Sequence, residues 1–104
     1  MLSFLKKLIG NSDKTDLKKL YTEGALILDV RMPQEFSQGH IKGAINVPLQ
    51  TLSKEIGLLK KKNKPVITCC LSGARSSTAS SLLTKNGIEA YNGGGWQSLQ
   101  SKIA

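Results

Sequence analysis

Cys70 is the candidate nucleophile of this sequence. It ends the apolar-leaning stretch PVITCC, and the loop LSGAR leads from it into a helix-like stretch that begins near Ser76. A short loop wrapped toward a helix N-terminus points backbone N–H groups inward, and the helix dipole adds partial positive charge there. Both effects lower the pKa of a thiol and hold its nucleophilic thiolate form. The pattern C-x-x-G-x-R-S therefore predicts a reactive thiol at Cys70 rather than an inert one.

Two further residues of this loop have types that suit an anion site. Gly73 allows backbone dihedrals that a side chain would forbid, and Arg75 offers a planar, permanently charged donor fork to a bound oxyanion. A papain-like protease would also need a histidine base, but the only histidine, His40, lies in the turn GHIKG, where we expect a structural loop residue. Two reaction classes need no such base: phosphoester hydrolysis through a cysteinyl phosphate and sulfur transfer through a cysteine persulfide.

Cys69 precedes the candidate nucleophile directly. Strand alternation points its side chain away from that of Cys70, and a disulfide between neighbouring cysteines is strained, so we expect a buried, inert thiol. The alternative is a resolving thiol that discharges a persulfide or protects it from over-oxidation.

Strands and helices alternate along the chain, and this order must position the loop. The pattern predicts strands over 25–30, 44–48, 65–70 and 88–91, with helices over 13–23, from Pro33 to Gly39, from Leu49 to the lysines near 60, over 76–86, and from about Trp96. Ser12 or Asp13 is the expected cap of the first helix, and Gly93, Gly94 and Gly95 are expected to form a turn. The alternation predicts a three-layer α/β domain with a mostly parallel sheet and its site at the carboxyl ends of the strands.

Composition restricts the classes of function. A chain of 104 residues makes one domain, and its formal charge of +8 suits anionic small molecules or an acidic partner protein. No aromatic residues interleave with the cluster of Lys60, Lys61, Lys62 and Lys64, so we expect no nucleic-acid partner. Two adjacent cysteines and one histidine provide neither a disulfide framework nor zinc-ligand spacing, so we expect no metal, no cofactor and a reducing compartment.

No apolar run approaches the length of a membrane span, and Lys6 and Lys7 interrupt the N-terminal apolar stretch before it could form a signal-peptide core. We therefore expect a soluble, cytoplasmic protein without stable membrane association. Residues 1–12 are expected to be an N-terminal extension, for which a membrane-surface amphipathic helix is the alternative.

Three motifs together resemble a known family. The stretch CLSGARS (70–76) resembles the active-site loop of rhodanese-like sulfurtransferases, and LDVRMPQEFSQGHIKGAINVPL (28–49) resembles that family's other two signatures in order and spacing. The resemblance runs from about Asp16 to Leu99 and includes NGGGW. It implies a single-domain rhodanese-like fold over 13–104 with a four- to five-stranded sheet covered by helices on both faces.

The resemblance also implies a mechanism. Cys70 would take the outer sulfur of a donor such as thiosulfate, hold it as a persulfide, and pass it to cyanide or a cellular thiol. Arg75 would orient the anionic donor, and backbone N–H groups of the loop would stabilise the persulfide; the loop residues are Leu71, Ser72, Gly73, Ala74 and Ser76. Cysteine-dependent phosphatases have five residues between Cys and Arg, whereas Cys70 and Arg75 are separated by four, which favours sulfur transfer.

Other residues of the motifs are weaker candidates. Asp29 and Arg31 end the first strand, and Asp29 could shape the pocket through hydrogen bonds to the loop, although Arg31 and Glu35 at i, i+4 suggest a structural role. Trp96 would either line the rim of the site or pack in the core. Two other functions stay open: a rhodanese-fold binding module that recognises an acidic sulfur-relay protein with little catalysis, and a phosphatase.

Overall fold

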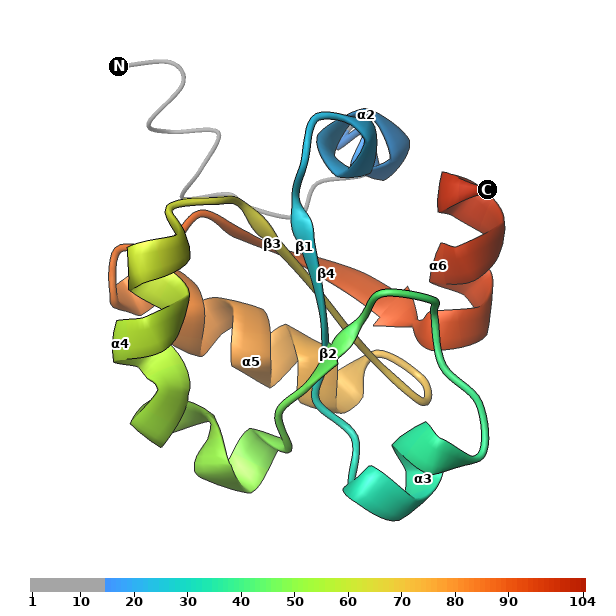
Figure 1. Ribbon diagram of the computed structural model, residues 1–104, viewed down its shortest axis with the longest axis horizontal. Coiled ribbons are helices and arrows are strands. Elements are labelled where there is room, and N and C mark those ends of the chain that lie inside the picture. Colours follow the sequence, from blue (N-terminus) through green and yellow to red (C-terminus); the bar gives the residue numbers. More distant parts are fainter. Residues whose placement is uncertain (1–14) are drawn as a thin grey trace.

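The computed structural model describes residues 15–104 (Figure 1). The predicted extension over 1–12, its alternative as a membrane-surface helix, and the predicted caps Ser12 and Asp13 lie outside the described residues. The first described helix, α2, spans Leu17–Thr22, so the predicted start at residue 13 is wrong. Asp16 caps this helix, and its carboxylate accepts the backbone N–H of Lys19 at 3.0 Å. Gly24 follows in the left-handed region, with φ +109°, and turns the chain into the sheet.

The sheet has four strands in the order β2-β1-β3-β4, and every neighbouring pair is parallel. Strand β1 spans Leu26–Asp29, β2 Ile45–Asn46, β3 Val66–Cys70 and β4 Ala90–Gly95. Strands β1, β2 and β3 fall inside the predicted ranges, and β4 begins two residues later than predicted. The prediction of an α/β fold with a mostly parallel sheet is confirmed.

Five helical segments connect and flank these strands. Helix α3 spans Pro33–Ser37, the 3-10 turn η1 Leu49–Thr51, α4 Leu52–Lys62, α5 Ala74–Lys85 and α6 Trp96–Ile103. Helix α5 begins at Ala74, two residues before the predicted start, because Gly73 serves as its N-cap. The active-site loop is therefore shorter, and closer to the helix N-terminus, than the sequence pattern suggested.

The helices cover both faces of the sheet, which gives the three layers predicted (Figure 1). On one face, α4 and α5 pack on the sheet through a cluster that includes Leu28, Leu52, Val66 and Leu83. On the other, α2 and α6 pack through Leu17, Ile27, Ile67 and Leu99. Strands β1 and β3 lie in the middle and contribute apolar side chains to both faces, as expected for strands covered on both sides.

The predicted turn at Gly93, Gly94 and Gly95 is wrong, because these glycines form the second half of β4. The register of β3 against β4 shifts between Thr68 and Cys70, and Gly94 takes φ +81° there. A Cβ on Gly93 would lie 2.7 Å from the carbonyl oxygen of Thr68 and 2.8 Å from the Leu99 side chain. The glycines thus let β4 run close to β3 and under α6, rather than reverse the chain.

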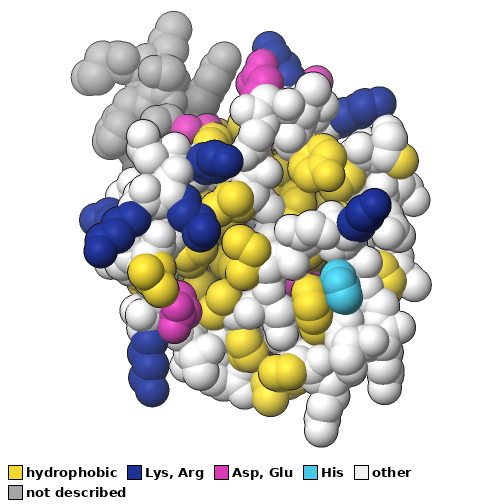
Figure 2. Space-filling view, viewed as in Figure 1, with side chains coloured by type: hydrophobic (Ala, Val, Ile, Leu, Met, Phe, Trp, Pro, Cys, Tyr) yellow, Lys and Arg dark blue, Asp and Glu magenta, His cyan; other side chains and the backbone are white. Residues whose placement is uncertain are grey.

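Basic side chains are scattered over the face shown in Figure 2, and several lie over α4 at the left of the view. The last turn of α4 holds exposed Lys60, Lys61 and Lys62. Within residues 15–104, the structure contains no helix that combines the length and apolarity needed to cross a membrane.

Candidate active site

Cys70 is the last residue of β3, one of the two central strands, and lies at the carboxyl edge of the sheet. Its side chain belongs to the cluster beneath α4 and α5, and the residue is 1% exposed. The chain then leaves the strand through Leu71, Ser72 and Gly73 and enters α5 at Ala74. The sequence prediction of a cysteine between a strand end and a helix N-terminus is confirmed.

Backbone N–H groups of the loop point at the sulfur of Cys70. The N–H of Gly73 donates to Sγ at 3.0 Å and that of Ser76 at 3.3 Å, while the Ser76 hydroxyl lies in hydrogen-bond contact at 3.4 Å. Gly73 has φ +108°, a backbone conformation that glycine adopts without strain, and this conformation turns its N–H inward. The loop therefore encloses the sulfur with donors from a helix N-terminus.

These contacts affect the pKa of the Cys70 thiol. Burial raises it, but the side-chain hydrogen bond with Ser76 and the hydrogen bonds from the backbone N–H groups of Ser76, Gly73 and Ser72 outweigh burial, so the pKa falls below that of an ordinary cysteine. The loop thus favours the thiolate more than an ordinary environment would, without a histidine base.

Asn92 in β4 supports this loop, and the sequence analysis did not identify it. Its Oδ1 accepts the Ser76 hydroxyl at 2.6 Å and the Gly94 N–H at 2.9 Å, and its Nδ2 donates to the Gly73 carbonyl at 3.3 Å. Strand β4 is thereby tied to both ends of the turn that carries the donors. A polar residue directly before a glycine run at a strand end was the available signal, but only the β3–β4 pairing places it beside the loop.

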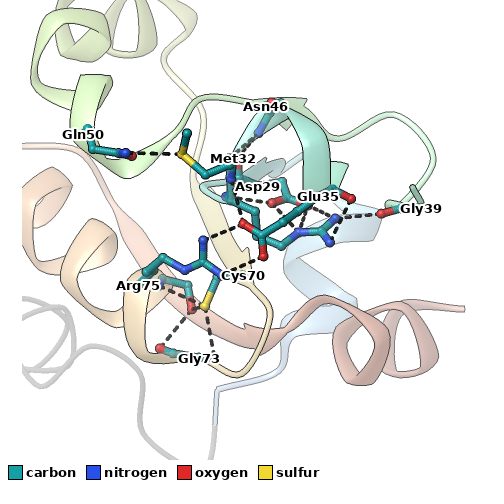
Figure 3. Close-up of polar contacts among 11 residues, drawn as sticks. Asp29, Met32, Glu35, Gly39, Asn46, Gln50, Cys70, Gly73 and Arg75 are labelled. Atoms are coloured by element: carbon teal, nitrogen blue, oxygen red, sulfur yellow. Dashed lines mark hydrogen bonds and ion pairs between the residues drawn. The ribbon is translucent and has the colours of Figure 1, made fainter. Parts of the chain in front are cut away.

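Arg75 reaches across the mouth of the loop to Glu35 of α3 (Figure 3). Its Nη1 lies 2.7 Å from Oε1 and its Nη2 3.0 Å from Oε2, and the two side chains are 36% and 32% exposed. The i, i+4 spacing in the sequence suggested that Glu35 lies opposite Arg31. Arg31 instead donates to the backbone carbonyl of Glu35 at 3.3 Å, so the carboxylate is left for Arg75.

The remaining candidates form a separate cluster around Arg31. Its guanidinium binds the buried Asp29 carboxylate at 2.8 Å, donates to the Gly39 carbonyl at 2.7 Å, and lies 4.9 Å from the ring centre of Trp96. Trp96 packs against the cluster on the α2 and α6 face. The Asp29 carboxylate thus accepts hydrogen bonds from Arg31 rather than from the loop. Asp29, Arg31 and Trp96 together stabilise the segment around α3 that follows β1.

Cys69 and His40 lie where the sequence analysis expected them. Cys69 is fully buried on the α2 and α6 face, and burial raises the pKa of its thiol to about 12. His40 is stacked on Phe36, and its Nδ1 lies 2.7 Å from the Phe36 carbonyl oxygen. Within the described range, no three His, Cys, Asp or Glu side chains gather in an arrangement that could hold a metal ion.

Comparisons with known proteins agree with this arrangement. The family model described as "Rhodanese-like domain" matches residues 13–102. The chain is 42% identical over 81 residues to the uncharacterized protein YqhL of Bacillus subtilis, covering 76% of this chain and 64% of that protein. It is 36% identical over 70 residues to the thiosulfate sulfurtransferase PspE of Escherichia coli, covering 65% of this chain and 67% of PspE. The chain therefore spans about two thirds of the length of these relatives.

The fold is shared with solved structures. A structure described as "rhodanese with anions from E. coli" superimposes with a TM-score of 0.66 at 32% identity, over 72% of this chain and 91% of that one. The loop that encloses Cys70, the parallel sheet and the family-model match over residues 13–102 lead to one assignment: the chain belongs to the rhodanese-like domain family.

Proposed function

We propose that this protein is a sulfurtransferase that carries sulfane sulfur as a persulfide on Cys70. The observation that supports this most is the loop itself, in which the N–H groups of Gly73 and Ser76 lie 3.0 and 3.3 Å from Cys70 Sγ. A persulfide is an anion that extends from the same sulfur, and inward-facing N–H groups stabilise such an anion. The sulfurtransferase PspE among the relatives points in the same direction.

The transfer would proceed in two steps. The Cys70 thiolate attacks the outer sulfur of thiosulfate; the new S–S bond forms as the donor's S–S bond breaks, and sulfite leaves with the bonding electron pair. An acceptor such as cyanide or a cellular thiolate then attacks the outer sulfur of the persulfide, and the Cys70 thiolate is released. No external oxidant and no cofactor take part, and the proton balance is zero when both nucleophiles are anions.

In this mechanism, different groups of the loop would bind the persulfide and the anionic donor. The backbone N–H groups between Leu71 and Ser76 would hold the persulfide, and Arg75 is the cation of the loop that could contact an anionic donor. Free thiols persist in reducing compartments, so we propose that the reaction takes place in the cytoplasm with a cellular thiol as acceptor. An acidic relay protein would match the net positive charge of the chain.

Intact-mass spectrometry tests the proposal. After incubation with thiosulfate and removal of small molecules, the protein should gain the mass of one sulfur atom and lose it again when cyanide is added, with thiocyanate released. Cys70→Ser should gain nothing, whereas Cys69→Ala should load as the unmodified protein does. If neither thiosulfate nor an organic sulfane-sulfur donor produces this adduct, the proposal is wrong.

A further inference from the structure

The Arg75 guanidinium, which could donate hydrogen bonds to a bound anion, already donates to a carboxylate of the protein. Arg75 meets the Glu35 carboxylate with two hydrogen bonds, at 2.7 and 3.0 Å. Glu35 is also anchored in place, because its Oε1 accepts the backbone N–H of Met32 at 3.0 Å, at the start of α3. Hydrogen bonds from Arg75 and from that N–H lower the pKa of Glu35 to about 2, so its carboxylate is charged at neutral pH. The positive charge of Arg75 is therefore largely neutralised.

The second arginine of the chain cannot replace it. Arg31 is bound to the buried carboxylate of Asp29 at 2.8 Å and lies 4.9 Å from the ring centre of Trp96. The only two arginines in the sequence are thus both engaged with carboxylates. An incoming anion would have to compete with Glu35 for Arg75, and it would do so against the charge of that carboxylate.

Apolar side chains are exposed on the two segments that carry Cys70 and Glu35. Leu71, the residue directly after Cys70, is 61% exposed, and Met32, which precedes the helix that carries Glu35, is 39% exposed. Figure 3 shows Met32 beside Glu35, with its Sδ accepting a hydrogen bond from Gln50 at 3.2 Å. Large exposed apolar side chains at a site suit a ligand with apolar surface of its own.

We propose that Glu35 is a specificity-determining residue that selects sulfur donors by charge. Because its single negative charge balances the positive charge of Arg75, the ion pair presents no net positive charge to a donor, and the site gains little from the second charge of the thiosulfate dianion. It favours donors with a single negative charge and an apolar body, the class of organic thiosulfonates. This inference rests on the sulfur-transfer function proposed above and concerns the choice of donor.

The chemistry of such a donor is the same as that of thiosulfate. The Cys70 thiolate attacks the outer sulfur of the thiosulfonate, the donor's S–S bond breaks, and an organic sulfinate leaves with the electron pair. The product on the protein is again the Cys70 persulfide, and no oxidant or reductant is needed. The two donors differ in charge and in apolar surface, and those are the properties to which Glu35, Leu71 and Met32 would respond.

Steady-state kinetics with thiosulfate and with benzenethiosulfonate, each with cyanide as acceptor, test the assignment. The unmodified protein should have a lower KM for benzenethiosulfonate than for thiosulfate. Glu35→Gln keeps an oxygen that can accept the Met32 N–H but removes the charge, so it should lower the KM for thiosulfate about fivefold, the size of an exposed ion pair's contribution. The KM for benzenethiosulfonate should change less, and kcat should stay within about twofold for both donors.

Three controls separate charge selection from a structural effect. Glu23→Gln makes the same change of net charge at the end of α2, before β1 begins, and should leave both KM values unaltered. Glu35→Asp retains the charge and should keep the higher KM for thiosulfate. High salt should narrow the difference in thiosulfate KM between Glu35→Gln and the unmodified protein, because it screens exposed charges.

The outcomes distinguish the two proposals. If the unmodified protein releases no thiocyanate with either donor and gains no sulfur by mass, the proposed function itself fails. If it transfers sulfur but Glu35→Gln leaves the thiosulfate KM unchanged or raises it, the function stands and the role of Glu35 is wrong. Equal KM values for both donors in the unmodified protein would also overturn the inference.

Discussion

Cys69 and Cys70 are neighbours in the chain, but their side chains lie on opposite faces of the sheet. Cys70 belongs to the cluster beneath α4 and α5, and Cys69 to the cluster beneath α2 and α6. Successive side chains of a β-strand point to opposite faces of the sheet, so the backbone of β3 lies between the two sulfur atoms. Only Cys70 is reached by the N–H donors of the loop.

This separation predicts that the two thiols react differently. Burial raises the pKa of Cys69 to about 12, whereas the hydrogen bonds of the loop hold the pKa of Cys70 below its ordinary value. Iodoacetamide at neutral pH should therefore modify Cys70 alone, as peptide mass mapping would reveal. Cys69→Ala should keep the same labelling rate and lower the free energy of unfolding by about 1 kcal/mol, because a buried sulfur is removed. Rapid labelling of Cys69 in the folded protein would contradict this account.

The pH dependence of alkylation should identify Ser76 as a source of the low pKa. As pH rises through the pKa of Cys70 the thiolate fraction grows, so the rate should rise with a midpoint below that of an ordinary cysteine. Ser76→Ala removes the side-chain hydrogen bond at 3.4 Å, which lowers the pKa of Cys70, so the midpoint should move to higher pH. Ser77→Ala, an exposed neighbour, is the matched control. Identical profiles for the Ser76→Ala variant and the unmodified protein would exclude this role of the hydroxyl.

Asn92 should matter for the stability of the loop. Its Oδ1 accepts hydrogen bonds from Ser76 and Gly94, and Asn92→Ala would leave both donors without that acceptor. We expect the free energy of unfolding to fall by about 1–2 kcal/mol in urea denaturation. Asn86→Ala removes one exposed contact, the 2.8 Å hydrogen bond to the Leu82 carbonyl, and should cost less. The role assigned to Asn92 would be incorrect if the two variants were equally stable.

Gly93 should tolerate no side chain. A Cβ there would lie 2.7 Å from the Thr68 carbonyl oxygen and 2.8 Å from side-chain atoms of Ile67 and Leu99, so Gly93→Ala should cost about 2–3 kcal/mol of stability. Gly57 lies inside α4 with open space around its Cβ position. Gly57→Ala should therefore raise the free energy of unfolding, by up to about 1 kcal/mol, because alanine favours the helix. Thermal or urea melts of the two variants should shift in opposite directions.

Local patterns in the sequence were enough to predict most of the elements. The apolar runs before Asp29 and through Cys70, together with Pro33, Gly39 and Gly87 at element ends, predicted an alternating α/β chain close to the one observed. The bounds of some elements differ by a few residues: α5 begins directly after its N-cap Gly73, and β4 begins at Ala90, which pairs with Val66 of β3. The glycine run was misread as a turn, because sequence does not show that β4 must pass close to Thr68 and beneath Leu99.

The sequence by itself determined the loop that holds the candidate nucleophile. Cys70, Gly73 and Arg75 lie within six consecutive residues between a strand and a helix, and a loop of that length is organised by local backbone geometry. Only the tertiary structure decided the partners of those residues. Glu35 is 40 positions from Arg75 in the sequence, and Asn92 is 16 positions from Ser76. A local sequence pattern does not predict contacts between residues so far apart. The i, i+4 spacing suggested that Glu35 pairs with Arg31, but the buried Asp29 takes that guanidinium. Sequence spacing reports neighbours along one element, whereas the electrostatic environment of this site depends on side chains that the folded sheet brings together.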